Sequence, residues 1–132
     1  MDIVVDANIY LVVILNEPEK SNIIERTKKV ELVSPEVLPY EIGNALVAMS
    51  KRKRLNKEEI LRGFNIFNMI PLRLVSVNIE KALDIAYTFN IYMYDAYYLE
   101  LAQRLKVPLL TLDNQMQDIA KTLKIKLLEV EL

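Results

Sequence analysis

Short runs of β-branched and other apolar residues alternate with longer stretches of helical periodicity, and this alternation constrains the fold more than any other feature. Strands separated by helices of ten or more residues need crossover connections, which make neighbouring strands parallel. The sequence therefore predicts an α/β fold with a mainly parallel central sheet of about four to five strands and helices on both faces. The predicted strands cover residues 3–5, 30–33, 72–75, 108–112 and 125–130.

The segments between these strands carry helix signals. Apolar residues at helical spacing follow the first strand and stop at the Glu17-Pro18-Glu19 break. Asn56, with Glu59 three residues later, is a capping-box signature that predicts a further helix, and Asn78 is a second candidate cap. The remaining helices are predicted over residues 21–29, 39–53, 79–89, 95–106 and 114–123.

Length and composition indicate one compact domain over residues 1–132. Apolar residues make up 52% of the chain and charged residues 27%, which argues against disorder. The longest apolar stretch, residues 3–16, contains Asp6 and Asn8 and is too short to cross a bilayer, and Asp2 does not suit a secretory leader. We therefore expect a cytoplasmic protein.

The chain has no cysteine and no histidine, and this double absence narrows the chemistry. It excludes disulfides, cysteine nucleophiles, Ser-His-Asp triads and histidine-based ribonucleases, and it makes zinc and copper sites improbable. Any hydrolysis must rest on carboxylates, and carboxylate sites prefer Mg²⁺, Mn²⁺ or Ca²⁺. The net charge of −1 argues against binding polyanions by long-range attraction.

Two acids, Asp6 and Asp113, follow predicted strands. The carboxyl ends of strands line the ligand crevice in doubly wound sheets, so both point toward a possible site. Taken singly, each is more simply interpreted as the N-cap of the following helix.

Glu41 and Asp95 lie on helices that otherwise face the core. Glu41 falls within the apolar stripe of its helix, and Asp95 shares a face with Leu99 and Ala102. A salt bridge is the alternative for Glu41, and stabilisation of the first helical turn is the alternative for Asp95. Binding of divalent cations by all four acids is a more economical explanation, and two metals bridged by carboxylates would suit phosphodiester cleavage.

The sequence around these acids resembles a known family. The hydrophobic strand before Asp6-Ala7-Asn8, the helical Pro39-Tyr40-Glu41-Ile42, Asp95-Ala96 with Tyr98-Leu99, and Leu110-Thr111-Leu112-Asp113 together resemble the PIN domain, especially VapC toxins. The match runs from about residue 3 to residue 130, with the motifs in the expected order and spacing.

The resemblance implies a Mg²⁺- or Mn²⁺-dependent endoribonuclease of a type II toxin–antitoxin system. Asp6, Glu41, Asp95 and Asp113 would be both the catalytic acids and the metal ligands, directly or through water. Asn8 and Thr111 would support them. The resemblance also implies a homodimer, an RNA substrate and a neutralising antitoxin. Asp118, the next acid, is expected on the solvated surface.

Two further features have ordinary interpretations. The basic run at residues 51–54 is interpreted as a solvated helix end rather than a grip on RNA phosphates. The tyrosines around Asp95, namely Tyr92, Tyr94, Tyr97 and Tyr98, are expected to serve packing, with at most one or two available for stacking on RNA bases.

Two other classes of protein remain as alternatives. A catalytically silent PIN domain acting in RNA processing or assembly predicts a broken acidic set, whereas all four acids are present. A receiver-like phosphoryl-transfer domain would carry a lysine on a late strand, and the strand predicted over residues 108–112 has none.

Overall fold

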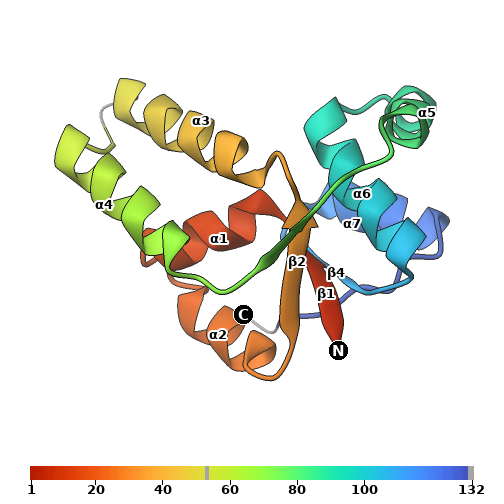
Figure 1. The fold of residues 1–132 in the computed structure, drawn as a ribbon, viewed down its shortest axis with the longest axis horizontal. Coiled ribbons are helices and arrows are strands. Elements are labelled where there is room, and N and C mark those ends of the chain that lie inside the picture. Colours follow the sequence, from red (N-terminus) through yellow and green to blue (C-terminus); the bar gives the residue numbers. More distant parts are fainter. Residues whose placement is uncertain (53, 131–132) are drawn as a thin grey trace.

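The computed structural model describes residues 1–52 and 54–130 and contains a four-stranded sheet between two groups of helices (Figure 1). The sheet order is β3-β2-β1-β4, and all pairs are parallel, which confirms the predicted α/β fold. The strands are β1 (Asp2–Val5), β2 (Glu31–Pro35), β3 (Arg73–Val75) and β4 (Leu109–Leu110). The helices are α1 (Ala7–Ile14), α2 (Lys20–Thr27), α3 (Leu38–Lys51), α4 (Lys57–Asn68), α5 (Ile79–Phe89), α6 (Met93–Leu105) and α7 (Asn114–Thr122).

Helices cover both faces of the sheet. Figure 1 shows α1 to α4 on one side of the strands and α5 to α7 on the other. Helices therefore cover the central strand β1 on both of its faces, and its residues Ile3, Val4 and Val5 are all buried. Such two-sided burial explains why the strand is a continuous apolar run rather than an alternating one.

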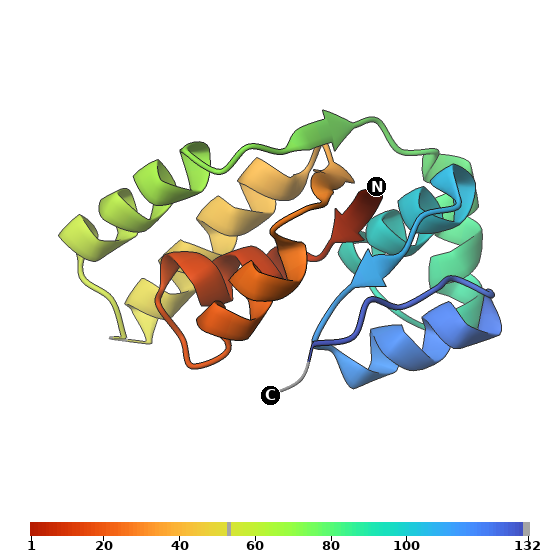
Figure 2. The ribbon, with the colours of Figure 1, turned by 90° about the horizontal axis from the view of Figure 1, so that it is seen from below.

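The strand predicted over residues 125–130 is wrong. That segment runs beside β4 (Figure 2) but forms only one isolated bridge, between Leu109 and Leu127. Leu109 N–H donates to the carbonyl of Lys126 at 2.8 Å, and Leu128 N–H donates to the carbonyl of Leu109 at 2.9 Å. The predicted fourth strand is also shortened to two residues, so it offers too short an edge for a longer ladder.

Helix boundaries differ slightly from prediction at the two helices that carry site residues. Helix α6 begins at Met93 after an extended Tyr92, so Asp95 lies within the first turn and does not open the helix. Helix α3 begins at Leu38, one residue earlier than predicted, because proline is accommodated in a first helical turn. The predicted end of this helix, Lys53, lies outside the described residues.

Both predicted helix caps are confirmed. Glu59 N–H donates to Asn56 Oδ1 at 2.9 Å, and Asn56 N–H donates to Glu59 Oε1 at 3.1 Å, which completes the capping box of α4. Lys81 N–H donates to Asn78 Oδ1 at 3.0 Å at the start of α5. No helix in the described part of the chain is long and apolar enough to span a membrane.

Candidate active site

Asp6 follows the last residue of the central strand and is buried, with 3% of its surface exposed. Its Oδ2 accepts a hydrogen bond of 2.8 Å from the hydroxyl of Thr111, which follows β4. Asp6 occupies the N-cap position of α1, yet its side chain makes no capping hydrogen bond. Helix capping therefore does not explain an aspartate at this buried position.

Glu41 lies in the first turn of α3 and is half-buried. Its Oε1 accepts a hydrogen bond of 2.8 Å from the hydroxyl of Tyr98, a fully buried residue of α6. The salt bridge considered for Glu41 is absent from the described residues. This role of Tyr98 was not predicted, because the tyrosines around Asp95 were expected to serve packing or base stacking.

Asp95 and Asp113 approach the same region from α6 and from the start of α7. Asp95 is half-buried in the first turn of α6. Asp113 caps α7, where its Oδ1 accepts a hydrogen bond of 3.0 Å from the backbone N–H of Met116. The capping interpretation therefore holds for Asp113, but a cap uses only one oxygen of its carboxylate.

The four carboxylates influence one another electrostatically. Burial raises the pKa of Asp6 to about 7; the hydrogen bond from Thr111 opposes this shift, while the charges of Glu41 and Asp95 add to it. The pKa of Glu41 is raised by burial, with the Tyr98 hydrogen bond lowering it and the charge of Asp95 raising it. The pKa of Asp95 is raised by burial and by the charge of Asp113. The structure thus brings all four predicted acids into one electrostatically coupled cluster.

This acidic cluster, consisting of Asp6, Glu41, Asp95 and Asp113, has no basic partner in the described chain, because none of its members forms an ion pair there. Its side chains are not arranged as a closed coordination sphere, since no three acids among residues 1–52 and 54–130 meet the geometry for holding one metal ion. Its donors are all carboxylate oxygens, which are the ligands that hard divalent cations prefer.

The two predicted supporting residues differ in their surroundings. Thr111 is buried and joins two acids, because its Oγ1 donates to Asp6 and accepts a hydrogen bond of 3.1 Å from the backbone N–H of Asp113. Asn8 is exposed on the first turn of α1, and its side chain makes no hydrogen bond within the described residues. Asp118 is exposed on α7, as expected for a surface acid.

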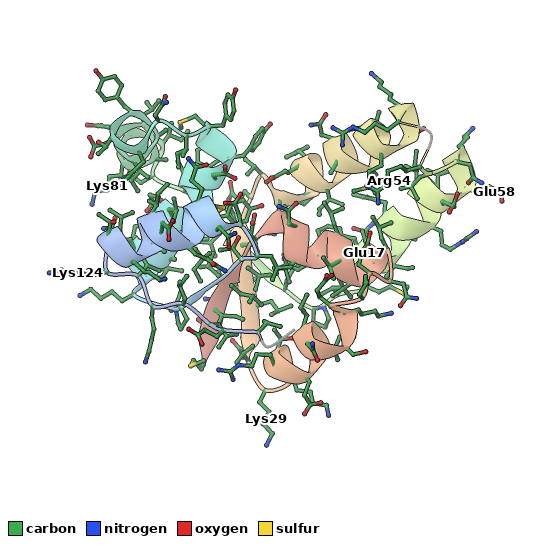
Figure 3. The ribbon with its side chains drawn as sticks, turned by 180° about the vertical axis from the view of Figure 1, so that it is seen from behind. Glu17, Lys29, Arg54, Glu58, Lys81 and Lys124 are labelled. Atoms are coloured by element: carbon green, nitrogen blue, oxygen red, sulfur yellow. The ribbon has the colours of Figure 1, made fainter. Side chains whose placement is uncertain are left out.

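The basic run ends in an ion pair. Arg54 lies 3.8 Å from Glu17 in the loop after α1, and Figure 3 labels both side chains. Lys51 and Arg52 are exposed at the end of α3, and Lys53 lies outside the described residues. Lys29 and Lys124 lie at the periphery of the molecule and point away from it in Figure 3.

The tyrosines around Asp95 divide between surface and core. Tyr92 and Tyr94 are exposed, Tyr97 is half-buried and Tyr98 is buried. They therefore do not form one stacking platform.

The parallel α/β/α fold, with its acidic cluster beyond the carboxyl ends of the central strands, places the chain among the open-sheet α/β proteins, which bind ligands at that edge of the sheet. Within that class, the chain belongs to the PIN domain family, whose model matches residues 3–122. The resemblance noted from the sequence motifs is thereby confirmed.

A relative is similar over most of the chain. The chain is 27% identical over 124 residues to Ribonuclease VapC3 of Pyrobaculum aerophilum, covering 89% of this chain and 94% of that protein.

Solved structures share the fold. PAE2754 from Pyrobaculum aerophilum matches with a TM-score of 0.70 and 19% identity, over 90% of this chain and 79% of the other. VapBC2 from Rickettsia felis, bound to a DNA fragment from their promoter, matches with a TM-score of 0.68 and 15% identity, over 99% and 100%. FitAcB from Neisseria gonorrhoeae matches with a TM-score of 0.63 and 13% identity, over 96% of each chain.

Proposed function

We propose that the protein is a VapC-like toxin, an endoribonuclease that hydrolyses RNA phosphodiester bonds with the help of Mg²⁺ or Mn²⁺. The observation that carries this proposal is the acidic cluster itself. The charge of each of Glu41, Asp95 and Asp113 raises the pKa of at least one other acid of the cluster. No Lys or Arg in the described residues forms an ion pair with any of the four carboxylates. Uncompensated carboxylates partly removed from water are costly unless a cation binds among them.

The proposed ligands are Asp6, Glu41, Asp95 and Asp113, acting directly or through water. A divalent cation held there would supply a Lewis acid that activates water and offsets phosphodiester charge. Like charges repel, so we expect these carboxylates to converge fully only around the ion, which agrees with the open arrangement of their side chains.

The supporting residues would act on opposite sides of the cluster. The hydroxyl of Thr111 fixes the Oδ2 atom of Asp6 and would hold this carboxylate in place for the ion. Asn8 is the second residue of α1 and its side chain is exposed, so it could contact RNA or a water bound at the site. This assignment makes Thr111 a positioning residue and Asn8 a contact from the solvent side.

The biological setting follows from similarity. The name of VapC3 describes a ribonuclease, and the likeness to it and to VapBC2 supports a toxin–antitoxin role for this chain. We extend the proposal to an RNA substrate, a homodimer, a cytoplasmic location and an antitoxin. An antitoxin that placed an Arg or Lys among the four carboxylates would block metal and substrate by charge pairing.

The alternative is a catalytically silent PIN domain that binds RNA or assembles with other proteins. It would retain the fold without needing the acids. The presence of all four acids in one cluster favours the enzyme.

The test is cleavage of a long single-stranded RNA by the purified protein with Mg²⁺ or Mn²⁺. Asp6→Asn and Asp95→Asn remove cluster charges, while Asp118→Asn removes an exposed charge of the same kind and serves as the matched control. Cleavage that is lost with EDTA and in both cluster variants, but kept by the control, supports the proposal. Folded protein that cuts none of several RNAs with either metal would favour the silent module.

A further inference from the structure

The hydrogen bond between Tyr98 and Glu41 joins two helices that lie on opposite sides of the sheet. Glu41 belongs to α3 and Tyr98 to α6, and Figure 1 shows these helices on either side of the strands. The two residues are 57 positions apart in the chain, and their oxygens are 2.8 Å apart. The contact therefore ties the α3 acid to the helix that also carries Asp95.

The donor in this contact is buried and uncharged. Tyr98 has no exposed surface, so water does not compete for its hydroxyl. An Arg or Lys in the same place would hold the carboxylate but would also neutralise it and repel a cation. A tyrosine hydroxyl restricts the side chain while leaving the full negative charge of Glu41 available.

Only one of the two carboxylate oxygens of Glu41 is engaged. Tyr98 donates to Oε1, and no hydrogen bond among the described residues reaches Oε2. No fully buried side-chain oxygen or nitrogen in that part of the chain lacks a partner, so Oε2 keeps some solvent exposure. Asp6 likewise accepts a neutral hydroxyl, that of Thr111, at Oδ2.

We propose that Tyr98 is a positioning residue, whose hydroxyl holds Glu41 in the acidic cluster with one oxygen free for a divalent cation. This inference rests on the proposed metal site. Without the hydroxyl, Glu41 would rotate among several conformations, and binding a cation would have to order it again. Groups that orient metal ligands in this way typically change metal affinity by about 10- to 100-fold.

The experiment measures Mn²⁺ affinity directly, by electron paramagnetic resonance of the free ion, so that it does not depend on RNA cleavage. Tyr98→Phe is expected to weaken Mn²⁺ binding by about 10- to 100-fold. Tyr10→Phe is the matched control, because Tyr10 is also buried and loses a hydroxyl bonded at 2.9 Å to Ser34 rather than to an acid. Its Mn²⁺ affinity should remain that of the wild type.

A double-variant comparison separates positioning from general destabilisation. Glu41→Gln alone should weaken Mn²⁺ binding, and adding Tyr98→Phe should weaken it no further, because the hydroxyl acts only through Glu41. An equal loss in both backgrounds, or a Tyr98→Phe affinity within about twofold of the wild type, overturns the inference. If Tyr98→Phe does not fold, Tyr98→Met carries the same expectations.

The two proposals fail differently. A wild-type protein that binds no Mn²⁺ removes the metal site and with it the proposed function. A wild-type protein that binds Mn²⁺ normally while Tyr98→Phe binds equally well removes only the role of Tyr98.

Discussion

Glu100 and Arg104 lie one turn apart on α6, and the Arg104 guanidinium links the buried Glu100 carboxylate to the β3–α5 connection. Arg104 Nε donates to Glu100 Oε2 at 2.8 Å, and its Nη2 donates to the carbonyl of Ser76 at 2.7 Å. Asn78 N–H also donates to Glu100 Oε1. This network attaches the start of α5 to α6, whose first turn carries Asp95.

Glu100→Ala should destabilise the fold by about 1–3 kcal/mol, because it leaves the Asn78 N–H without its acceptor and removes the partner of Arg104, whose side chain is 35% exposed. Urea denaturation measures the change in the free energy of unfolding. The matched control is Glu25→Ala, which breaks an exposed pair with Lys28 and should change little. A loss below about 1 kcal/mol for Glu100→Ala would show that the network is not stabilising.

Asp6→Asn should stabilise the metal-free protein at alkaline pH. Burial raises the pKa of Asp6 from 3.8 to about 7, so between these values the folded protein holds a proton that the unfolded chain has released. Stability therefore falls as pH rises through this window, by up to about 4 kcal/mol. The amide carries no charge and escapes this loss.

Urea denaturation in EDTA at pH 4 and pH 8 checks this expectation. The variant should exceed the wild type in stability at pH 8 and match it closely at pH 4. The exposed Asp118→Asn should show no such difference between the two pH values. Equal stabilities of Asp6→Asn and the wild type at pH 8 would mean that the Asp6 charge is not costly.

Mn²⁺ binding should strengthen as pH rises. Protons and cations compete for the same carboxylates, and a pKa of about 7 for Asp6 leaves most of this residue protonated at pH 6. Between pH 6 and pH 8 the dissociation constant should fall about tenfold from Asp6 alone. Titration calorimetry measures the trend, and a pH-independent affinity would contradict it.

Thr111→Val should weaken Mn²⁺ binding by about 10- to 100-fold while nearly preserving side-chain volume. The substitution removes the hydroxyl that donates to Asp6 and accepts from the Asp113 backbone. Thr111→Ser keeps the hydroxyl and should retain most of the affinity. If the valine and serine variants bind Mn²⁺ equally, the hydroxyl does not position Asp6.

The sequence predicted those parts of the fold that follow from local patterns. The β1 run of Ile3, Val4 and Val5 was predictable because a parallel strand covered on both faces is apolar throughout. The caps at Asn56 and Asn78 were predictable because each uses hydrogen bonds within a single turn. Local chemistry therefore identified most helices and their starting points.

Contacts between distant segments were not predictable from such patterns. The apolar pattern of residues 125–130 predicted a strand, but it contained no information on the length of β4, which has only two residues available for pairing. The sequence around Tyr98 contained nothing about Glu41, which lies on another helix and 57 positions away. The order and spacing of the motifs pointed to Asp6, Glu41, Asp95 and Asp113 as the proposed metal ligands, whereas the hydrogen-bond donors beside these acids required the three-dimensional structure.

The hydrogen bond from Thr111 to Asp6 spans 105 residues, so Asp6 is synthesised long before the residue that orients it. The second edge of β1 can likewise be paired only after β4 has been synthesised. A chain still emerging from the ribosome therefore has Asp6 and Glu41 but lacks Asp113 and the hydroxyl that orients Asp6. On the proposed activity, a nascent copy spares the RNA that encodes it until Thr111 and Asp113 have been translated and folded onto the earlier part of the chain.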